Sequence, residues 1–167
     1  MLKDLQKGGI FLLNSLWEPE EMGEKLPAKV KRDLAKKEIN FYTIDAWKIA
    51  EEIGLGGRIN MIMQAAFFKL TQVIPTDDAV RYLKEGIEKT YKRKGRQIIE
   101  MNWKAVDQGI NAVKKVEIPA DWIDAEDQPG RVIDLPPFIE DILIPMNSQE
   151  GDDLPVSRFL DMADGTF

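Results

Sequence analysis

The order of apolar and polar segments near the start of the chain is the feature that most limits how it can fold. Residues 10–15 form an apolar run that follows two glycines and ends in small polar side chains. Residues 39–45 alternate apolar and β-favouring side chains. The first pattern predicts a buried strand of a parallel sheet and the second a further strand.

Helix signals follow each of these predicted strands. Pro27 is suited to the first position of a helix that runs to Glu38. Asp45 can cap a helix over residues 46–53, and Gly54 is placed where a helix-ending glycine belongs. Strand, helix, strand and helix in this order are typical of a βαβ unit.

Helical patterns dominate the middle of the chain, over residues 58–72, 79–94 and 97–116. From residue 119 onward prolines and acidic side chains accumulate, which predicts an extended arm with one short helix near residues 138–144. The predicted class is α/β: a partial Rossmann-like, mostly parallel sheet with flanking helices, followed by an extended acidic proline-rich arm.

The chain contains no cysteine and no histidine. These absences exclude disulfides, thiolate nucleophiles, cysteine-ligated iron–sulfur clusters, histidine metal sites and serine–histidine triads formed by this chain alone. Any chemistry must use carboxylates, amines, hydroxyls, backbone groups or a cofactor held elsewhere.

Charge is distributed unevenly around a net value of −6. Basic residues outnumber acidic ones over residues 79–115, and the reverse holds over residues 117–167. A nucleic-acid-binding protein rarely carries so acidic a segment, so no nucleic-acid partner is expected. No apolar stretch is long enough for a membrane helix and no secretory signal is recognisable, so a cytoplasmic location without membrane contact is expected.

A glycine cluster, Gly54-Leu55-Gly56-Gly57, stands before a helical pattern that carries Arg58, Asn60 and Gln64. Backbone N–H groups at such a turn can receive a phosphate, while the alternative is a helix C-cap followed by a tight turn. Asn60 and Gln64 share a helix face, where their amides either contact a ligand or are buried and bonded to a neighbouring loop.

Several segments resemble the pyruvate:ferredoxin (pyruvate:flavodoxin) oxidoreductase family, specifically the second half of its gamma-type domain. The most specific is the ungapped run GLGGRINMIMQAAFFKL. The resemblance implies a division into residues 1–118, the C-terminal part of that domain, and residues 119–167, a linker toward a small following domain. The other segments that carry it are residues 8–15, 26–32, 41–46, 117–122, 145–152 and 164–167.

This resemblance implies oxidation of pyruvate with coenzyme A to acetyl-CoA and carbon dioxide, with electrons passed to ferredoxin or flavodoxin. At the level of the whole enzyme it implies thiamine diphosphate, magnesium and 4Fe–4S clusters, none held by this segment alone, and an oligomeric assembly with the remaining domains or subunits. It also implies a contribution to coenzyme A binding. The expected contacts are Asn60, Arg58 and Gln64, with Asn14 at a strand's carboxyl end as a further candidate.

The family's glycine-rich opening unit and its thiamine and cluster domains are not found in this sequence. We therefore expect a piece of a split, truncated or excised enzyme that does not oxidise pyruvate alone. Two alternatives stay open: a packing or interaction module without a ligand of its own, including a remnant of a truncated enzyme, and a segment of a related enzyme for another 2-oxoacid.

Overall fold

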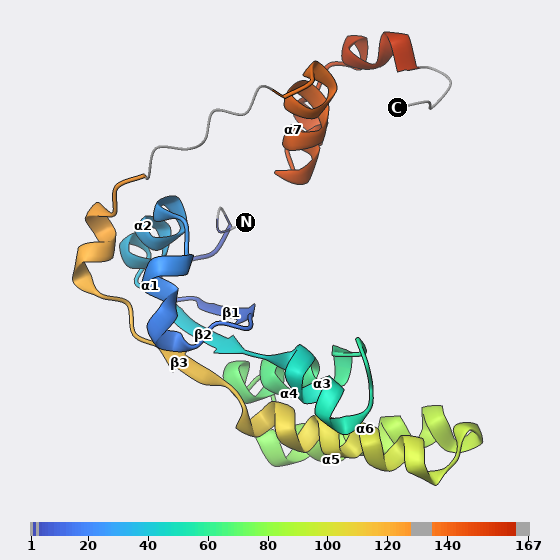
Figure 1. Ribbon diagram of the computed structural model, residues 1–167. Helices are drawn as coiled ribbons and strands as arrows, with labels where there is room; N and C mark the ends of the chain where they lie inside the picture. Colours follow the sequence, from blue (N-terminus) through green and yellow to red (C-terminus); the bar gives the residue numbers. More distant parts are fainter. Residues whose placement is uncertain (1, 3, 128–134, 163–167) are drawn as a thin grey trace. The chain divides into compact units, whose positions relative to one another are not determined.

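The computed structural model describes residues 2, 4–127 and 135–162, and the part up to Asp127 forms an α/β fold around a small sheet (Figure 1). Strand β1 (Ile10–Asn14) pairs in parallel with β2 (Asn40–Ile44), and β2 pairs antiparallel with β3 (Lys114–Val116). The two strands expected from the sequence are therefore confirmed, and the α/β class with them.

Strand β3 differs from the sequence-based expectation, in which the helical pattern continues to residue 116. Helix α6 (Arg96–Asn111) instead ends earlier, and the chain turns back to pair with β2. Val116 is buried beside Phe41, while the two lysines before it are exposed. So short a strand lacks the alternation that identifies one in a sequence, and its partner across the sheet decides its conformation.

The connection from β1 to β2 contains three short helical segments: a 3-10 turn at Pro19–Glu21, α1 (Met22–Lys25) and α2 (Ala28–Lys36). Pro27 lies at the cap position of α2, one residue before the position expected for it. These segments bury Met22 and Leu34 completely, against Phe41 of β2. The rings of Phe41 and Phe11 stack with their centroids 5.4 Å apart.

Four helices follow β2: α3 (Ala46–Ile53), α4 (Asn60–Thr71), α5 (Thr76–Tyr91) and α6. The Asp45 side chain accepts a hydrogen bond from the backbone N–H of Lys48, and Gly54 ends α3 with a φ of 87°, as the sequence indicates. Helices α4 and α6 approach closely at Gly109, where an added Cβ would lie 2.5 Å from the backbone oxygen of Ile62.

Strand β1 lies at the outer edge of the sheet. The oxygen of Gly9 and the N–H of Ser15 bond to β2, so the pleat directs the backbone groups of Ile10, Leu12 and Asn14 to the other side. Within residues 2, 4–127 and 135–162 no strand pairs with that side.

Residues beyond 118 depart from the expectation of an extended arm. Ala120–Asp124 forms a 3-10 helix, and Trp122 is buried against the core that contains Met22 and Leu34. Arg32 of α2 bonds to the backbone oxygen of Ala125 and to the carboxylate of Asp127. Burying one indole removes enough apolar area from water to fix this segment despite its polar neighbours.

The chain divides into two compact units, one from Leu2 to Asp127 and one in the residues that follow. The second unit contains a π-helical turn (Ile139–Leu143) that continues into α7 (Ile144–Asn147), which confirms the short helix expected there. Two 3-10 segments come next, Gly151–Asp153 and Val156–Met162. The division at residues 118 and 119 stays a prediction.

No helix in the described ranges combines the length and the apolar character needed to cross a membrane.

Candidate functional site

The turn that leads into α4 leaves backbone donors open. Gly54 and Gly56 both adopt positive φ, at 87° and 59°, which only glycine adopts without strain. Ile59 occupies the cap position of α4 and offers no side-chain acceptor to the first turn. The first N–H groups of a helix have no partner within it, so this end of a 12-residue helix presents unpaired donors and a partial positive charge.

Three of the residues expected to contact a ligand surround this helix start. Asn60 is the first residue of α4, Arg58 stands two positions before it, and Gln64 follows one turn later. All three are exposed. The Nε of Arg58 donates to the oxygen of Leu55 at 2.9 Å, which directs the guanidinium over the turn. The alternative that Asn60 and Gln64 are buried amides is therefore wrong.

Asn14 lies at the carboxyl end of β1, as expected, but its amide has a structural partner. Its Oδ1 accepts a hydrogen bond of 2.9 Å from the backbone N–H of Ala46, the first residue of α3. Asn14 thus connects β1 to α3. Within the described residues, no hydrogen bond joins it to Arg58, Asn60 or Gln64.

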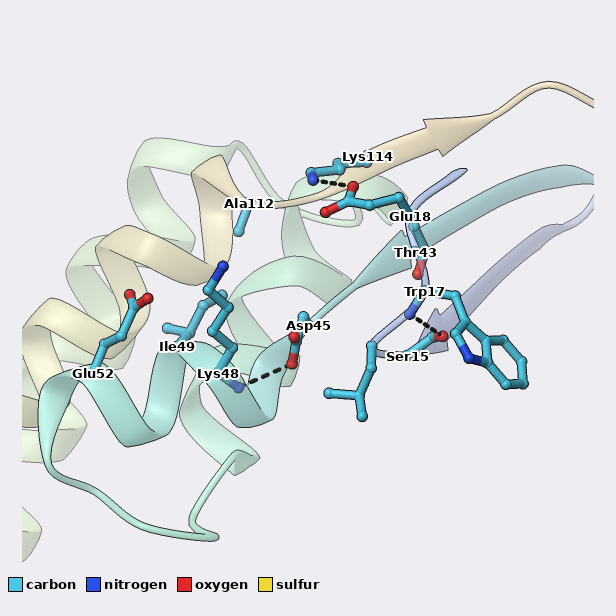
Figure 2. A pocket seen from close by; sticks show the side chains of 11 residues that line it. Ser15, Trp17, Glu18, Thr43, Asp45, Lys48, Ile49, Glu52, Ala112 and Lys114 are labelled. Carbon is cyan, nitrogen blue, oxygen red and sulfur yellow. Dashed lines mark hydrogen bonds and ion pairs between the residues drawn. The ribbon is translucent and has the colours of Figure 1, made fainter. Parts of the chain in front are cut away.

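A pocket of about 310 Å³ opens at the carboxyl ends of β1 and β2 (Figure 2). Ser15 and Thr43, both buried, lie at its inner side, and Lys48 and Glu52 extend into it from α3. Glu18 and Lys114 form an ion pair across another side. Open α/β sheets bind ligands at this end of their strands. The pocket is lined by both lysines and carboxylates, so it can contact a polar ligand but does not favour an anion over a cation.

Sequence reasoning missed this pocket because its walls come from segments far apart in the chain. Glu18 and Lys114 meet only because β3 pairs with β2, and that strand was not expected. The one available signal was Asn14-Ser15 at the end of the first predicted strand, at the edge of the sheet where this pocket lies.

A groove of about 240 Å³ runs between α4 and α5. Gln64 and Met61 line it from α4, and Tyr82, Gly86 and Tyr91 line it from α5. Gln64 is the one candidate from the sequence that lines this groove, and Asn60 directly precedes the lining residue Met61 in the chain. The two tyrosines were not expected to belong to any site.

These side chains offer polar, charged and aromatic contacts to a ligand. Within the part of the chain that the structure describes, no group of three or more Asp or Glu side chains is placed to hold a metal ion. The only clearly perturbed acid–base group among the described residues is Arg81. Its hydrogen bond to Asp78 raises the pKa of the guanidinium further above its ordinary value, so it remains a cation.

Comparison with known proteins gives two family matches. Residues 1–112 match the model of pyruvate ferredoxin/flavodoxin oxidoreductase, and residues 124–167 match that of a domain of unknown function.

The pyruvate:ferredoxin oxidoreductase of Moorella thermoacetica is 51% identical over 168 residues, and the pyruvate-flavodoxin oxidoreductase of Enterobacter agglomerans is 53% identical over 167. Each match covers 100% of this chain and 14% of the relative, so the chain spans a small part of these curated relatives.

Among solved structures, the pyruvate oxidoreductase subunit PORC of Thermotoga maritima superposes with a TM-score of 0.54 at 23% identity. The superposition covers 70% of this chain and 57% of that subunit, and it shows a shared fold.

Proposed function

This chain belongs to the pyruvate ferredoxin/flavodoxin oxidoreductase family, and from that premise we propose that it forms one part of an enzyme that oxidises pyruvate in the cytoplasm. In the proposed reaction pyruvate and coenzyme A give acetyl-CoA and carbon dioxide, and the released electrons pass to ferredoxin or flavodoxin. The observation that supports this most strongly is identity above 50% to two such enzymes over the whole chain.

The cofactors of the proposed reaction are assigned to other parts of the enzyme. Cysteine thiolates hold 4Fe–4S clusters, and this sequence has no cysteine, so its residues do not fit a cluster. Thiamine diphosphate supplies the carbanion chemistry wherever it is bound in such enzymes. In the described ranges, no cluster of three or more Asp or Glu side chains is arranged to bind a magnesium ion. The chain's own proposed contributions are coenzyme A binding and assembly.

The proposed coenzyme A contact is the turn before α4. Coenzyme A carries phosphate groups, and the uncapped first turn of α4 offers N–H donors and a positive helix end to an anion. Arg58 adds a permanent cation to the same turn, and Asn60 adds an exposed amide. Gln64 lies one helical turn beyond. Asn14 is a weaker candidate, since its amide oxygen already bonds to α3.

The proposed role in assembly is supported by an apolar hollow beside the end of β1. Leu16, Trp17 and Trp47 are 68%, 40% and 48% exposed, and together with Leu13 they line a cavity of about 310 Å³. Exposed aromatic side chains that gather around a hollow are typical of surfaces that contact another protein part. The relatives are about seven times as long as this chain, so a large remainder of the enzyme is available to cover it.

The test uses an intact enzyme that carries Asn60→Ala. We expect the coenzyme A-dependent step to weaken while pyruvate-driven reduction of the cofactors stays nearly unchanged. Lost hydrogen bonds are worth about 1–3 kcal/mol, or roughly 5- to 150-fold in coenzyme A affinity. Lys69→Ala, an exposed change at the other end of α4, serves as the control and should leave both steps unchanged.

Two outcomes would favour the alternatives. Equal impairment of both half-reactions with a lower melting temperature would mean that Asn60 stabilises the fold, which leaves only a packing module. Faster turnover with a different 2-oxoacid than with pyruvate would assign the chain to a related enzyme of the family.

A further inference from the structure

The groove between α4 and α5 is open for a reason that packing within the described residues does not supply. Gly86 lies inside the 16-residue helix α5, where glycine is less favourable than alanine. A Cβ added at Gly86 would meet no atom within 4 Å, whereas one added at Gly109 would meet the backbone of α4. Close packing therefore explains Gly109 but not Gly86. A glycine on the surface of a helix lets the backbone of another segment approach closely.

The side chains on either side of Gly86 form a mostly apolar surface. Tyr82 and Tyr91 line the groove from α5, and Met61 and Gln64 line it from α4. Tyr82 is 54% exposed. Nine positions of a helix separate the two tyrosines, so the groove follows α5 for about 13 Å, or roughly two and a half turns. A furrow between two packed helices is the shape that receives the side-chain ridge of a third helix.

Unpaired cations gather where the groove ends at Tyr91. Four of the six residues from 89 to 94 are lysine or arginine. All four are exposed, and none forms an ion pair within the described residues. The ammonium of Lys94 lies 5.3 Å from the ring centroid of Tyr91. The negative end of a helix dipole balances only about half an elementary charge, so most of this positive charge has no counterpart.

The end of the groove at Tyr82 has no such excess of charge. The guanidinium carbon of Arg81 lies 4.4 Å from the ring centroid of Tyr82. The same guanidinium is paired with the carboxylates of Asp78 and Glu85. A segment that lies along the groove therefore meets a mostly apolar surface, with uncompensated positive charge at one end only.

We infer that this groove receives an amphipathic helix from the remainder of the enzyme, with Asp or Glu side chains at the end that meets residues 89–94. The inference rests on the proposed function, because the chain covers only 14% of each of its two relatives and the helix belongs to the other part. Apolar side chains spaced three and four positions apart contact Tyr82, Tyr91 and Met61. The helix crosses α5 at Gly86, where the two backbones approach closely.

A cross-linking experiment on the intact enzyme identifies the occupant. Photo-reactive benzoylphenylalanine replaces Tyr82, so an aromatic side chain is kept in the groove, and mass spectrometry identifies the captured peptide. We expect one peptide from outside the 167 residues, with apolar residues at helical spacing and Asp or Glu at one end. The matched control places the same group at Glu88, an exposed position on the face of α5 away from Gly86, and should capture far less.

Hydrogen exchange tests the shape of the groove. Residues 82–91 should exchange about tenfold or more slowly in the intact enzyme than in the 167-residue chain, because the docked helix protects α5. Gly86→Leu fills the groove and should abolish that difference. The isolated Gly86→Leu chain should exchange as the unaltered chain does, since a Cβ at this position meets no atom within 4 Å.

Charge reversal tests the basic end of the groove. Lys92→Glu, Arg93→Glu and Lys94→Glu together should remove about fivefold or more of the protection, and more at low salt than at high salt. The same change of charge on α1 and α2 is the matched control and should leave the protection unaltered. Its three exposed positions are Lys25→Glu, Lys29→Glu and Lys36→Glu.

The inference is overturned if position 82 captures nothing, captures a second copy of this chain, or captures as much as position 88. Full protection in Gly86→Leu would overturn it as well. Neither Arg58 nor Asn60 lines the groove, so its failure leaves the coenzyme A test on Asn60→Ala unaffected. If the expected helix is captured in an assembly that does not oxidise pyruvate, the proposed activity fails and the docking groove stands.

Discussion

The sheet region and the helical region of residues 2–127 are stabilised in different ways. Around β2 the core is filled by large side chains, with Phe41, Met22 and Leu34 fully buried. Between α4 and α6 the contact depends on small residues, among them Ala65 and Gly109, which let the two backbones approach. The sheet region is stabilised by large side chains that fill its core, and the helical region by small side chains that allow close contact. Shortening a side chain should therefore destabilise the first region, and enlarging one should destabilise the second.

Removing volume from the sheet region should have the largest effect. Phe41→Ala deletes a fully buried ring that stacks on Phe11, and we expect a loss of about 3–5 kcal/mol in the free energy of unfolding. Denaturant titration of the chain measures it. Phe67→Ala on α4 is the matched control, because that ring is 50% exposed and its loss should cost only about 1 kcal/mol. Equal losses would contradict a core centred on β2.

Adding volume to the helical region should come next. Gly109→Ala places a methyl group 2.5 Å from the backbone oxygen of Ile62, so α4 and α6 must move apart. We expect a loss of about 1–3 kcal/mol, measured by the same titration. Gly57→Ala adds the same methyl group where nothing lies within 4 Å and should cost far less. A neutral Gly109→Ala would mean that the two helices are not closely packed.

The smallest effect is expected where the two regions join. Asn14→Ala removes the acceptor for the N–H of Ala46 and should lower the free energy of unfolding by about 1 kcal/mol. Asn14→Asp keeps an acceptor oxygen at the start of α3 and should retain most of the stability. If both variants have wild-type stability while coenzyme A binding falls in the intact enzyme, Asn14 acts on the ligand instead.

Local signals in the sequence predicted most elements of the fold. The glycines before β1, the cap at Asp45 and the stop at Gly54 each act within a few residues, and the structure confirms the elements that they delimit. Strand β3 and the burial of Trp122 were missed. Both depend on a partner that is distant in the sequence. Strand β3 pairs with β2, and the indole packs against the core around α2, so no local pattern predicts either.

The candidate site was predictable only in part, for the same reason. The turn before α4 is continuous in sequence, so its glycines and Arg58 could be identified together. The α4–α5 groove brings Gln64 next to Tyr82 and Tyr91, and the sequence gives no sign of that proximity. The pocket at the ends of β1 and β2 is likewise assembled by tertiary contacts.

The outer edge of β1 is a place where one molecule of this chain can pair with another. Ile10, Leu12 and Asn14 direct backbone donors and acceptors to a side where, in the described part of the chain, no strand pairs with them. Ile10–Leu13 contains no charge and no proline, the features that normally protect such an edge. An extended segment from another molecule can dock there, and its own far edge then becomes available. Because such pairing joins separate molecules, we expect association of this chain to increase with its concentration.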